Sequence, residues 1–383
     1  MRFFKISLLV ALLSVVAFAQ GETPHPAWSE LPRPGGEQNK GLFLEPALLN
    51  MGSRFHLVWS GTNEQIRRPE VFHSTLDGGA KEWKDPRAPF FGKNKARVRK
   101  VALGKTRNLI GLVFQRTLTQ GNDAYEVLLA LSSDQGWSWS GTIEIDSYVA
   151  DKTGGTAVAI EGRQGSNRPE FAIAWTRAYG DVRTANFDIN SSLRPEGSQV
   201  GTHADGAEKV GVGTLGSEGF TVVFNNGAGL TAAYIKALIG KVEEGSSLLR
   251  GRFGKFFSVA SRPYGPSRVV VGSDTTVESL TSDGKDWKKD EETANLPFNA
   301  RDVDAESDMD DNKNLHVAMI RPVKDGFELW YLGQKDKKWN APEHVYTFAD
   351  KVDVRGFDIA ASNDYAVIVV SQGFAGKFFR RKL

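Results

Sequence analysis

Short β-rich runs recur along this chain at a nearly constant interval, and this repeat constrains the fold more than any other feature. The first residues of successive runs lie 54, 62, 49, 48, 47 and 50 residues apart. A repeat of this length is typical of a solenoid, a propeller or another array of small units. The seven runs are residues 55–59, 109–114, 171–175, 220–224, 268–271, 315–320 and 365–370.

Each run is flanked by further strand-like stretches and by Gly-rich turns, whereas a helical period of 3.6 residues is almost entirely missing. In the second unit, residues 98–103 precede the run, residues 125–132 follow it, and a fourth strand is expected at 141–145. Four strands per unit at this interval describe the blades of a β-propeller. The sequence therefore predicts an all-β propeller of four-stranded antiparallel blades. Seven blades are favoured, and six remain open if one weak unit is an insertion.

The seventh unit ends early, because only residues 354–360, 365–370 and 377–380 supply strands before the chain stops. The segment around residues 28–31 can provide the missing outer strand. Such pairing would close the ring and remove exposed sheet edges, which favour aggregation. Residues 20–383 are therefore predicted to form a single propeller domain without a linker.

The first 19 residues have the pattern of a secretory signal peptide. Arg2 and Lys5 form a basic start, residues 6–16 are apolar apart from one serine, and Ala17-Phe18-Ala19 provides a cleavage site. No later stretch approaches the roughly 18 apolar residues of a membrane-spanning helix. The sequence predicts cleavage after Ala19 and a secreted or periplasmic protein without a membrane span.

Composition narrows the classes of partner. The chain has 48 Lys and Arg against 46 Asp and Glu, a net charge of +2 that falls to 0 once Arg2 and Lys5 are removed. A basic surface for nucleic acid is therefore not expected. The chain contains no cysteine, so thiolate metal sites are excluded and a large core must hold an exported protein without disulfides. We expect a monomer with no resident cofactor.

One turn carries a recognisable pattern, S-x-D-x-G-x-x-W, formed by Ser132, Asp134, Gly136 and Trp139. The Asp carboxylate can accept backbone N–H groups within a tight turn, and the Gly can adopt a positive φ. The Trp covers the turn with a large apolar ring. This pattern resembles the Asp-box of sialidase-like β-propellers, which in that family joins the third and fourth strands of a blade.

Degenerate copies of the pattern follow at residues 75–83 and 281–287, with a fainter one at 333–339. The structural residues expected in the first two copies are Asp77, Trp83, Asp283 and Trp287. The resemblance implies the propeller fold over most of the mature chain. Sialidases themselves have six blades, so a count of seven departs from that family.

In a propeller, the loops between the second and third strands share one face with the beginnings of the innermost strands. Arg side chains gather at these positions, and their forked guanidinium groups suit carboxylate, sulfate or phosphate. The alternative is that these charges are solvated or pair with one another. The predicted ligand-binding residues are Arg67, Arg68, Arg97, Arg99, Arg177, Tyr179, Arg301, Asp302, Arg321, Asp353 and Arg355.

Catalytic assignments do not follow from these residues. The sialidase resemblance would imply three Arg around a substrate carboxylate, a Tyr nucleophile with a Glu partner, and an Asp acid, but the Phe-Arg-Ile-Pro motif of that family is missing. Tyr179 and Tyr264 are candidate nucleophiles, and Asp302 with Asp353 is a candidate carboxylate pair. The sequence favours a non-catalytic exported propeller that binds a glycan or a protein, with an anionic ligand on its Arg-rich axial face. The alternative is a glycoside hydrolase of exo-sialidase type acting on anionic sugars, so catalysis is left open.

A calcium site is a further hypothesis. Asp308, Asp310 and Asn312 place oxygen donors at alternate positions, as calcium loops do. Ordinary Asp/Asn turns have the same composition, and no Glu completes an EF-hand loop.

Overall fold

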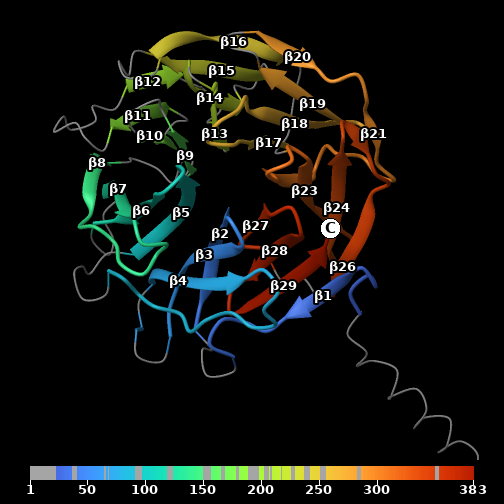
Figure 1. Cartoon of the computed structure of the whole chain (residues 1–383), viewed down its shortest axis with the longest axis horizontal. Helices are drawn as coiled ribbons and strands as arrows, with labels where there is room; N and C mark the ends of the chain where they lie inside the picture. The colour runs from blue at the N-terminus through green and yellow to red at the C-terminus, as the bar shows by residue number, and fades with distance from the viewer. Residues whose placement is uncertain are drawn as a thin grey trace, which may run out of the picture.

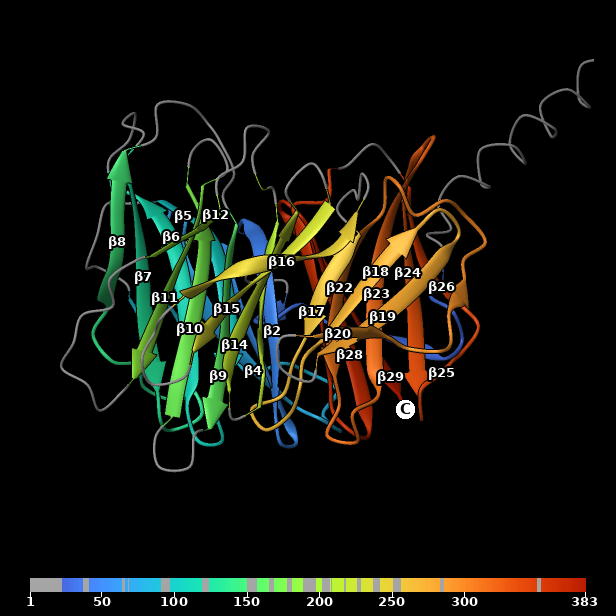
Figure 2. The ribbon, with the colours of Figure 1, turned by 90° about the horizontal axis from the view of Figure 1, so that it is seen from above.

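The chain folds into a ring of seven antiparallel sheets around a central axis (Figure 1). The computed structural model describes residues 23–36, 41–63, 66–67, 69–90, 97–118, 124–149, 157–164, 169–177, 181–188, 198–201, 207, 209–216, 218–225, 229–236, 242–250, 256–282, 286–349 and 353–383. These residues contain β-strands and no α-helix. Figure 2 shows the ring from its edge, with turns and loops gathered on two opposite faces.

The first four blades follow one another along the chain, each with its innermost strand first. Blade one contains β2 (Phe43–Met51), β3 (Arg54–Gly61) and β4 (Glu70–Asp77). Blade two contains β5 (Arg97–Lys105), β6 (Ile110–Thr117), β7 (Ala124–Ser132) and β8 (Ile143–Val149). Blade three contains β9 (Val158–Gln164), β10 (Pro169–Thr176), β11 (Val182–Asp188) and β12 (Ser198–Gly201). Blade four contains β13 (Val210–Thr214), β14 (Gly219–Asn225), β15 (Gly229–Lys236) and β16 (Val242–Arg250).

The remaining blades vary in their outer strands. Blade five contains β17 (Phe257–Ala260), β18 (Arg268–Ser273), β19 (Thr276–Ser282), β20 (Trp287–Lys289) and β21 (Ala294–Asn295). Blade six contains β22 (Asp304–Met309), β23 (Leu315–Val323), β24 (Gly326–Lys335), β25 (Lys338–Trp339) and β26 (Glu343–Ala349). Blade seven contains β27 (Gly356–Ala361), β28 (Tyr365–Gln372), β29 (Ala375–Lys382) and β1 (Trp28–Leu31).

The two ends of the chain meet in blade seven, which closes the ring. Strand β1 pairs antiparallel with β29, and Trp28 lies opposite Arg381 while Leu31 lies opposite Phe378. Figure 1 shows β1 beside the last strand of the chain. The prediction of an all-β propeller with seven blades, closed by the N-terminal strand, is confirmed. Blade one differs from the expected four strands: its described residues form three, with a single further bridge between His73 and Arg87.

The hydrophobic core is divided among the gaps between blades. Seven clusters of buried residues occur in the described parts of the chain, and each cluster joins side chains of two neighbouring blades. Blades one and seven meet around Phe43, Trp59 and Phe378, for example, with ring centroids of Phe43 and Phe378 5.3 Å apart. Burial between blades therefore fixes each sheet edge-on to the axis, and the innermost strands line a central channel.

Two faces of the ring must be distinguished. We call the face with the turns between first and second strands the turn face; the connections between third and fourth strands lie there too, as the bond from Gly78 N to Ser53 O (2.8 Å) shows. The opposite face carries the loops between second and third strands and the beginnings of the innermost strands. We call it the loop face. The bond from Phe43 N at the start of β2 to Gly373 O in the β28–β29 loop (2.6 Å) joins two such segments of blades one and seven.

The turn after β7 is held by its own polar side chains. Asp134 Oδ1 accepts hydrogen bonds from Ser138 N and Ser132 Oγ, both at 2.9 Å, and Ser132 Oγ accepts one from Gly136 N (2.8 Å). The Ser138 hydroxyl also donates to Asp134 Oδ2 (2.5 Å). This bond contributes most to lowering the pKa of Asp134 to about 2, and the bonds from Ser138 N and Ser132 Oγ add to the effect. The ring of Trp139 is half-buried against the cluster between blades one and two. That this turn is an Asp-box in the family sense remains a prediction.

The degenerate copies differ in detail. Trp83 is buried, Trp287 is half-buried with its Nε1 donating to Tyr234 Oη (3.0 Å), and Asp283 lies outside the described residues. Asp77 accepts a hydrogen bond from Arg54 Nε (2.8 Å) instead of from the backbone of its own turn.

Candidate functional site

The central channel is lined by charged side chains on the innermost strands. It has a volume of about 370 Å³. Its charged residues are Glu45, Lys100, Glu161, Lys209, Asp304, Glu306, Asp308 and Asp358. Acids outnumber bases in this set, so the channel carries an excess of carboxyl groups.

Two lysines neutralise part of this excess. Lys100 Nζ lies 2.5 Å from Glu45 Oε2, and Lys209 Nζ lies 2.9 Å from Asp304 Oδ1 and 2.8 Å from Glu306 Oε1. Burial raises the pKa of Glu45 and of Glu306, because the charged form of each carboxyl loses hydration. The pKa of Lys209 is also raised: its two acidic neighbours outweigh the effect of burial.

Two other acids are held by backbone groups instead of cations. Asp358 accepts hydrogen bonds from Leu48 N (2.6 Å) and Ile359 N (2.8 Å), and Glu161 accepts one from Gly162 N (2.8 Å). Burial raises the pKa of Glu161 to about 7 and that of Asp358 well above its usual range. A carboxyl with a pKa near 7 can hold or release a proton at neutral pH.

A larger cavity of about 1050 Å³ lies on the turn face, and we call it the turn-face cavity. Its described lining comes from the turns β2–β3, β5–β6, β17–β18, β22–β23 and β24–β25, and from the segment that includes β20. Blades one, two, five and six thus contribute to one hollow. The residues of this lining that carry the argument below are Lys105, Arg107, Arg262, Tyr264, Asp311, Lys313, Lys337 and Lys338.

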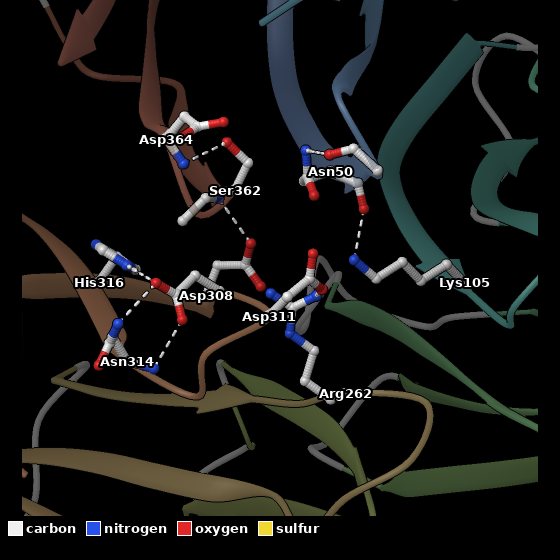
Figure 3. Close-up of polar contacts among 12 residues, drawn as sticks. Asn50, Lys105, Arg262, Asp308, Asp311, Asn314, His316, Ser362 and Asp364 are labelled. Carbon is white, nitrogen blue, oxygen red and sulfur yellow. Dashed lines mark hydrogen bonds and ion pairs between the residues drawn. The ribbon is translucent and has the colours of Figure 1, made fainter. Parts of the chain in front are cut away.

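Two cations, Lys105 and the largely buried Arg262, lie close together in the lining of this cavity. Figure 3 shows Lys105, Arg262 and Asp311 reaching toward one another from different blades. Lys105 is only 8% exposed, and its Nζ donates to Asn50 O at 2.5 Å. Arg262 pairs through Nη1 with Asp311, and its Nε and Nη2 are buried with no acceptor among the described residues. Burial lowers the pKa of Lys105, and the neighbouring Asp308 counteracts this.

The rim of the turn-face cavity carries exposed cations beside the exposed acids Glu291, Glu292 and Asp336, together with one exposed aromatic ring. Arg107, Lys313, Lys337 and Lys338 are exposed there, and Tyr264 is 61% exposed. Elsewhere in the lining, Arg268 pairs with Asp290 in a largely buried contact. The cavity therefore has buried hydrogen-bond donors at its base and exposed Lys and Arg side chains at its rim.

The Arg residues predicted on the loop face lie outside the described lining of the channel, although the charge of Arg355 acts on Glu45 within it. Several are paired with acids: Arg177 Nη2 lies 2.5 Å from Asp146 Oδ1, Arg321 Nη1 lies 3.1 Å from Glu328 Oε2, and Arg355 Nη2 lies 3.0 Å from Asp353 Oδ2. Exposed side chains that make no ion pair with another described residue are Arg67, Arg97, Arg99, Arg301 and Asp302. None of these loop-face residues is among the described lining of the channel. Arg68 and Tyr179 lie outside the described residues.

The proposed calcium ligands point to different partners. Asp308 Oδ2 accepts a hydrogen bond from Ala361 N (2.8 Å), whereas Asp310 Oδ1 and Oδ2 accept from Asn314 N (2.8 Å) and Asn314 Nδ2 (2.9 Å). Asn312 is exposed. Among the described residues, no group of three or more His, Cys, Asp or Glu could hold a metal ion. Asp310 thus has the contacts of an ordinary Asx turn.

The sequence alone does not mark Lys105, Arg262, Asp311 or Glu161 as site residues, and it indicates Tyr264 only as a candidate nucleophile. Each lies in a short turn or on an innermost strand where charged residues are common. The burial of Lys105 depends on packing between blades, which no local pattern reveals. A charged residue on an innermost strand, such as Glu161, was the one feature of the sequence that could have indicated a site residue in the channel.

Comparison with known proteins supports the fold but names no family for this chain. No family model matches it, and no curated protein matches it. The endosialidase of phage phi92 superimposes with a TM-score of 0.51 at 9% identity, covering 93% of this chain and 69% of that chain. A protein of unknown function from Dyadobacter fermentans gives 0.50 at 10% identity, covering 94% and 100%. The SapL1 lectin, solved with alpha methyl fucoside, gives 0.48 at 11% identity, covering 81% and 97%.

The fold is a seven-bladed β-propeller, and it is similar to the fold of the phage phi92 endosialidase. Identities this low show the fold alone, and the site must carry the functional argument. No described segment of the chain forms a helix long and apolar enough to cross a membrane.

Proposed function

We propose that this propeller is an exported protein that binds an acidic carbohydrate in the turn-face cavity. The observation that carries the proposal is the pair of buried cations at the base of the cavity. Arg262 has two buried N–H groups without an acceptor in the described chain, and Lys105 has one described acceptor for three donor hydrogens. Buried donors are normally satisfied, so an incoming anion would find hydrogen bonds that the protein leaves unmade.

The shape and surroundings of the cavity favour a sugar over a small inorganic anion. Its volume of about 1050 Å³ is at the upper end of ordinary ligand sites. The exposed ring of Tyr264 offers an apolar surface for the C–H face of a pyranose. A carboxylate or sulfate on the same sugar would reach Arg262 and Lys105, because a guanidinium suits such groups well. The preferred site thus moves from the loop face to the turn face.

The test is calorimetric binding of the mature protein to sialylated, sulfated, uronate-containing and neutral oligosaccharides. We expect binding of at least one acidic glycan that weakens as salt rises, since exposed lysines contribute at the rim. The variant Lys105→Met should lose affinity about tenfold or more, because a charge-assisted hydrogen bond disappears. Met has a similar volume, and Lys105 makes no ion pair within 4 Å with a described carboxylate, so we expect the variant to fold. Arg97→Ala, which removes an exposed loop-face cation, is the matched control.

A second candidate function is glycoside hydrolysis, and one observation favours it. Glu161 lies in the channel with a pKa of about 7, and the charges of Lys105 and Asp308 act on it. A carboxyl with a raised pKa is what a general acid requires. A panel of fluorogenic glycosides, sialosides included, tests this candidate. If the wild type hydrolyses a substrate and Glu161→Gln does not, the protein is an enzyme. If the wild type hydrolyses none of the substrates, the proposal of carbohydrate binding stands without catalysis.

Export is the remaining part of the proposal. The basic start, apolar run and small-residue site within residues 1–19 support a cleaved signal, although these residues lie outside the described structure. Sequencing the N-terminus of the protein recovered from the medium or periplasm should give Gln20 as its first residue.

A further inference from the structure

A second hollow lies on the turn face between blades one and two, apart from the turn-face cavity. It has a volume of about 410 Å³. Blade one supplies its floor through His73, Ser74 and Trp83, and blade two supplies Gln135 and Trp137 from the turn after β7. We call it the inter-blade pocket. It shares no lining residue with the turn-face cavity.

Trp137 lies outside the hydrophobic clusters formed by the described residues. It is 61% exposed, while Trp139, two residues later, packs into the core between the blades. The guanidinium carbon of Arg87 lies 4.3 Å from the Trp137 ring centroid and covers one side of the ring. A large exposed aromatic surface that borders a hollow is typical of a ligand site.

The turn holds this ring in place. Trp137 N donates to Asp134 O (3.4 Å), and its two neighbours are fixed by the bonds from Gly136 N to Ser132 Oγ and from Ser138 N to Asp134 Oδ1. A platform fixed before binding loses little conformational entropy when a ligand stacks on it. The fixed backbone of this turn therefore favours a role for the Trp137 ring in binding a ligand.

The polar groups around the ring suit hydroxyls better than an anion. Arg54 Nε and Lys84 Nζ both pair with Asp77, at 2.8 and 3.2 Å. Arg54 Nη1 also donates to Gln135 Oε1 (3.2 Å), which leaves the amide nitrogen of Gln135 at the pocket wall. The pocket thus offers donors and acceptors with little net charge beside an apolar ring.

We propose that the inter-blade pocket binds a neutral pyranose residue, with the apolar face of the sugar stacked on Trp137 and its hydroxyls bonded to Gln135 and Arg87. This assignment is independent of the acidic-carbohydrate site at the axis. Because both sites open on the turn face, a branched or extended glycan that reached both would gain avidity from the second contact.

The test uses methyl pyranosides of glucose, galactose, mannose and fucose, with N-acetylglucosamine, titrated into the mature protein by calorimetry and by tryptophan fluorescence. We expect at least one to bind and to change the fluorescence. Trp137→Ala should weaken that sugar about tenfold, whereas Trp137→Phe should keep most of the affinity because a ring remains. Phe374→Ala removes an aromatic that is 70% exposed on the loop face and is the matched control.

The same titrations in Lys105→Met separate the two sites. Neutral pyranoside binding should be unchanged in that variant, so this result does not depend on whether the turn-face cavity binds an acidic carbohydrate. The assignment is wrong if none of the sugars binds the folded wild type, or if Trp137→Ala binds them as tightly as wild type.

Discussion

At the scale of single residues, Gly136 occupies a place that a larger side chain cannot share. Its φ is +79°, and a Cβ at this position would lie 2.3 Å from Cε1 of His73. Both the backbone conformation and the contact therefore oppose substitution. We expect Gly136→Ala to lower the free energy of unfolding by about 2 kcal/mol or more, measured by urea denaturation.

Gly141→Ala is the control for this prediction. Gly141 lies near the same blade edge, has no positive φ, and nothing lies within 4 Å of its Cβ position. Its replacement should change stability by less than about 0.5 kcal/mol. Equal stability of the two variants would show that a Cβ at position 136 makes no unfavourable contact with His73.

His56 and His73 form a buried pair whose charge state affects stability. The rings are stacked, with Nδ1 of His56 3.2 Å from Nε2 of His73. Burial lowers the pKa of His56 to about 3 and that of His73 to about 4, and nearby cations add to the effect. Both rings are therefore neutral in the folded protein at pH 5, whereas the unfolded chain takes up protons below about pH 6.5.

The sign of the pH dependence follows from these pKa values. The unfolded state binds more protons between about pH 6.5 and pH 4, so the pair contributes stability above pH 6.5 that is lost as pH falls. The loss should approach at most about 1.4 kcal/mol per pH unit for each ring. The raised pKa of Glu161 acts in the opposite direction, so the effect is measured as a difference. The double variant His56→Leu, His73→Phe should lose less stability than wild type between pH 7 and pH 5, and equal slopes would contradict the prediction.

At the scale of the elements, the repeated strands could be predicted because they alternate and recur. The run at 365–370 falls within β28, and the run at 315–320 falls within β23. Each is the second strand of its blade, buried on both sides, and so has the most continuous apolar character. Outer strands were less predictable. The described residues of blade one show only the bridge between His73 and Arg87 beyond β4, because solvent-facing edges need no fixed pattern.

The candidate site was predictable only in part, for a physical reason. Its residues come from turns of four blades, and each turn on its own is an ordinary polar loop. Arg355 and Asp353 look like potential ligands in the sequence, yet they pair with each other at 3.0 Å. Lys105 looks like a solvated turn residue, yet packing of blade two against its neighbours buries it. Burial and pairing arise from tertiary contacts, which a single sequence does not display.

The two tryptophans of the turn after β7 allow a test of this element. Trp139 packs against His73 and Phe90, with ring centroids 5.6 and 6.4 Å away. Because the ring is half-buried, Trp139→Ala should cost about 3 kcal/mol, the lower end of the range for large aromatic truncations. Trp137→Ala should cost about 0.5–1 kcal/mol, the value of an exposed cation–π contact with Arg87. Thermal unfolding compares them, and equal losses would mean that Trp139 does not anchor the turn.

At the scale of the whole molecule, closure of the ring depends on the short strand β1. The side chain of Trp28 in β1 is buried, and its ring centroid lies 5.1 Å from that of Tyr331 in blade six. Leu31, at the other end of β1, belongs to the cluster shared with blade one. The strand also covers the outer edge of β29 through four residue pairs. One four-residue strand thus contributes to two inter-blade cores and removes an exposed edge.

We therefore expect deletion of residues 23–31 from the mature protein to be severely destabilising. Two buried side chains would leave the clusters beside blade seven, and the backbone donors and acceptors of β29 would be exposed to pairing with other chains. Sedimentation should show association that grows with protein concentration, together with a lower Tm. The surface ion pair between Lys377 Nζ and Glu30 Oε1 (2.6 Å) belongs to the same strand pair, and Glu30→Ala should cost under about 1 kcal/mol. A deleted protein that stays monomeric with an unchanged Tm would show that the ring closes without β1, since the remaining strands of blade seven would then hold against blades six and one on their own.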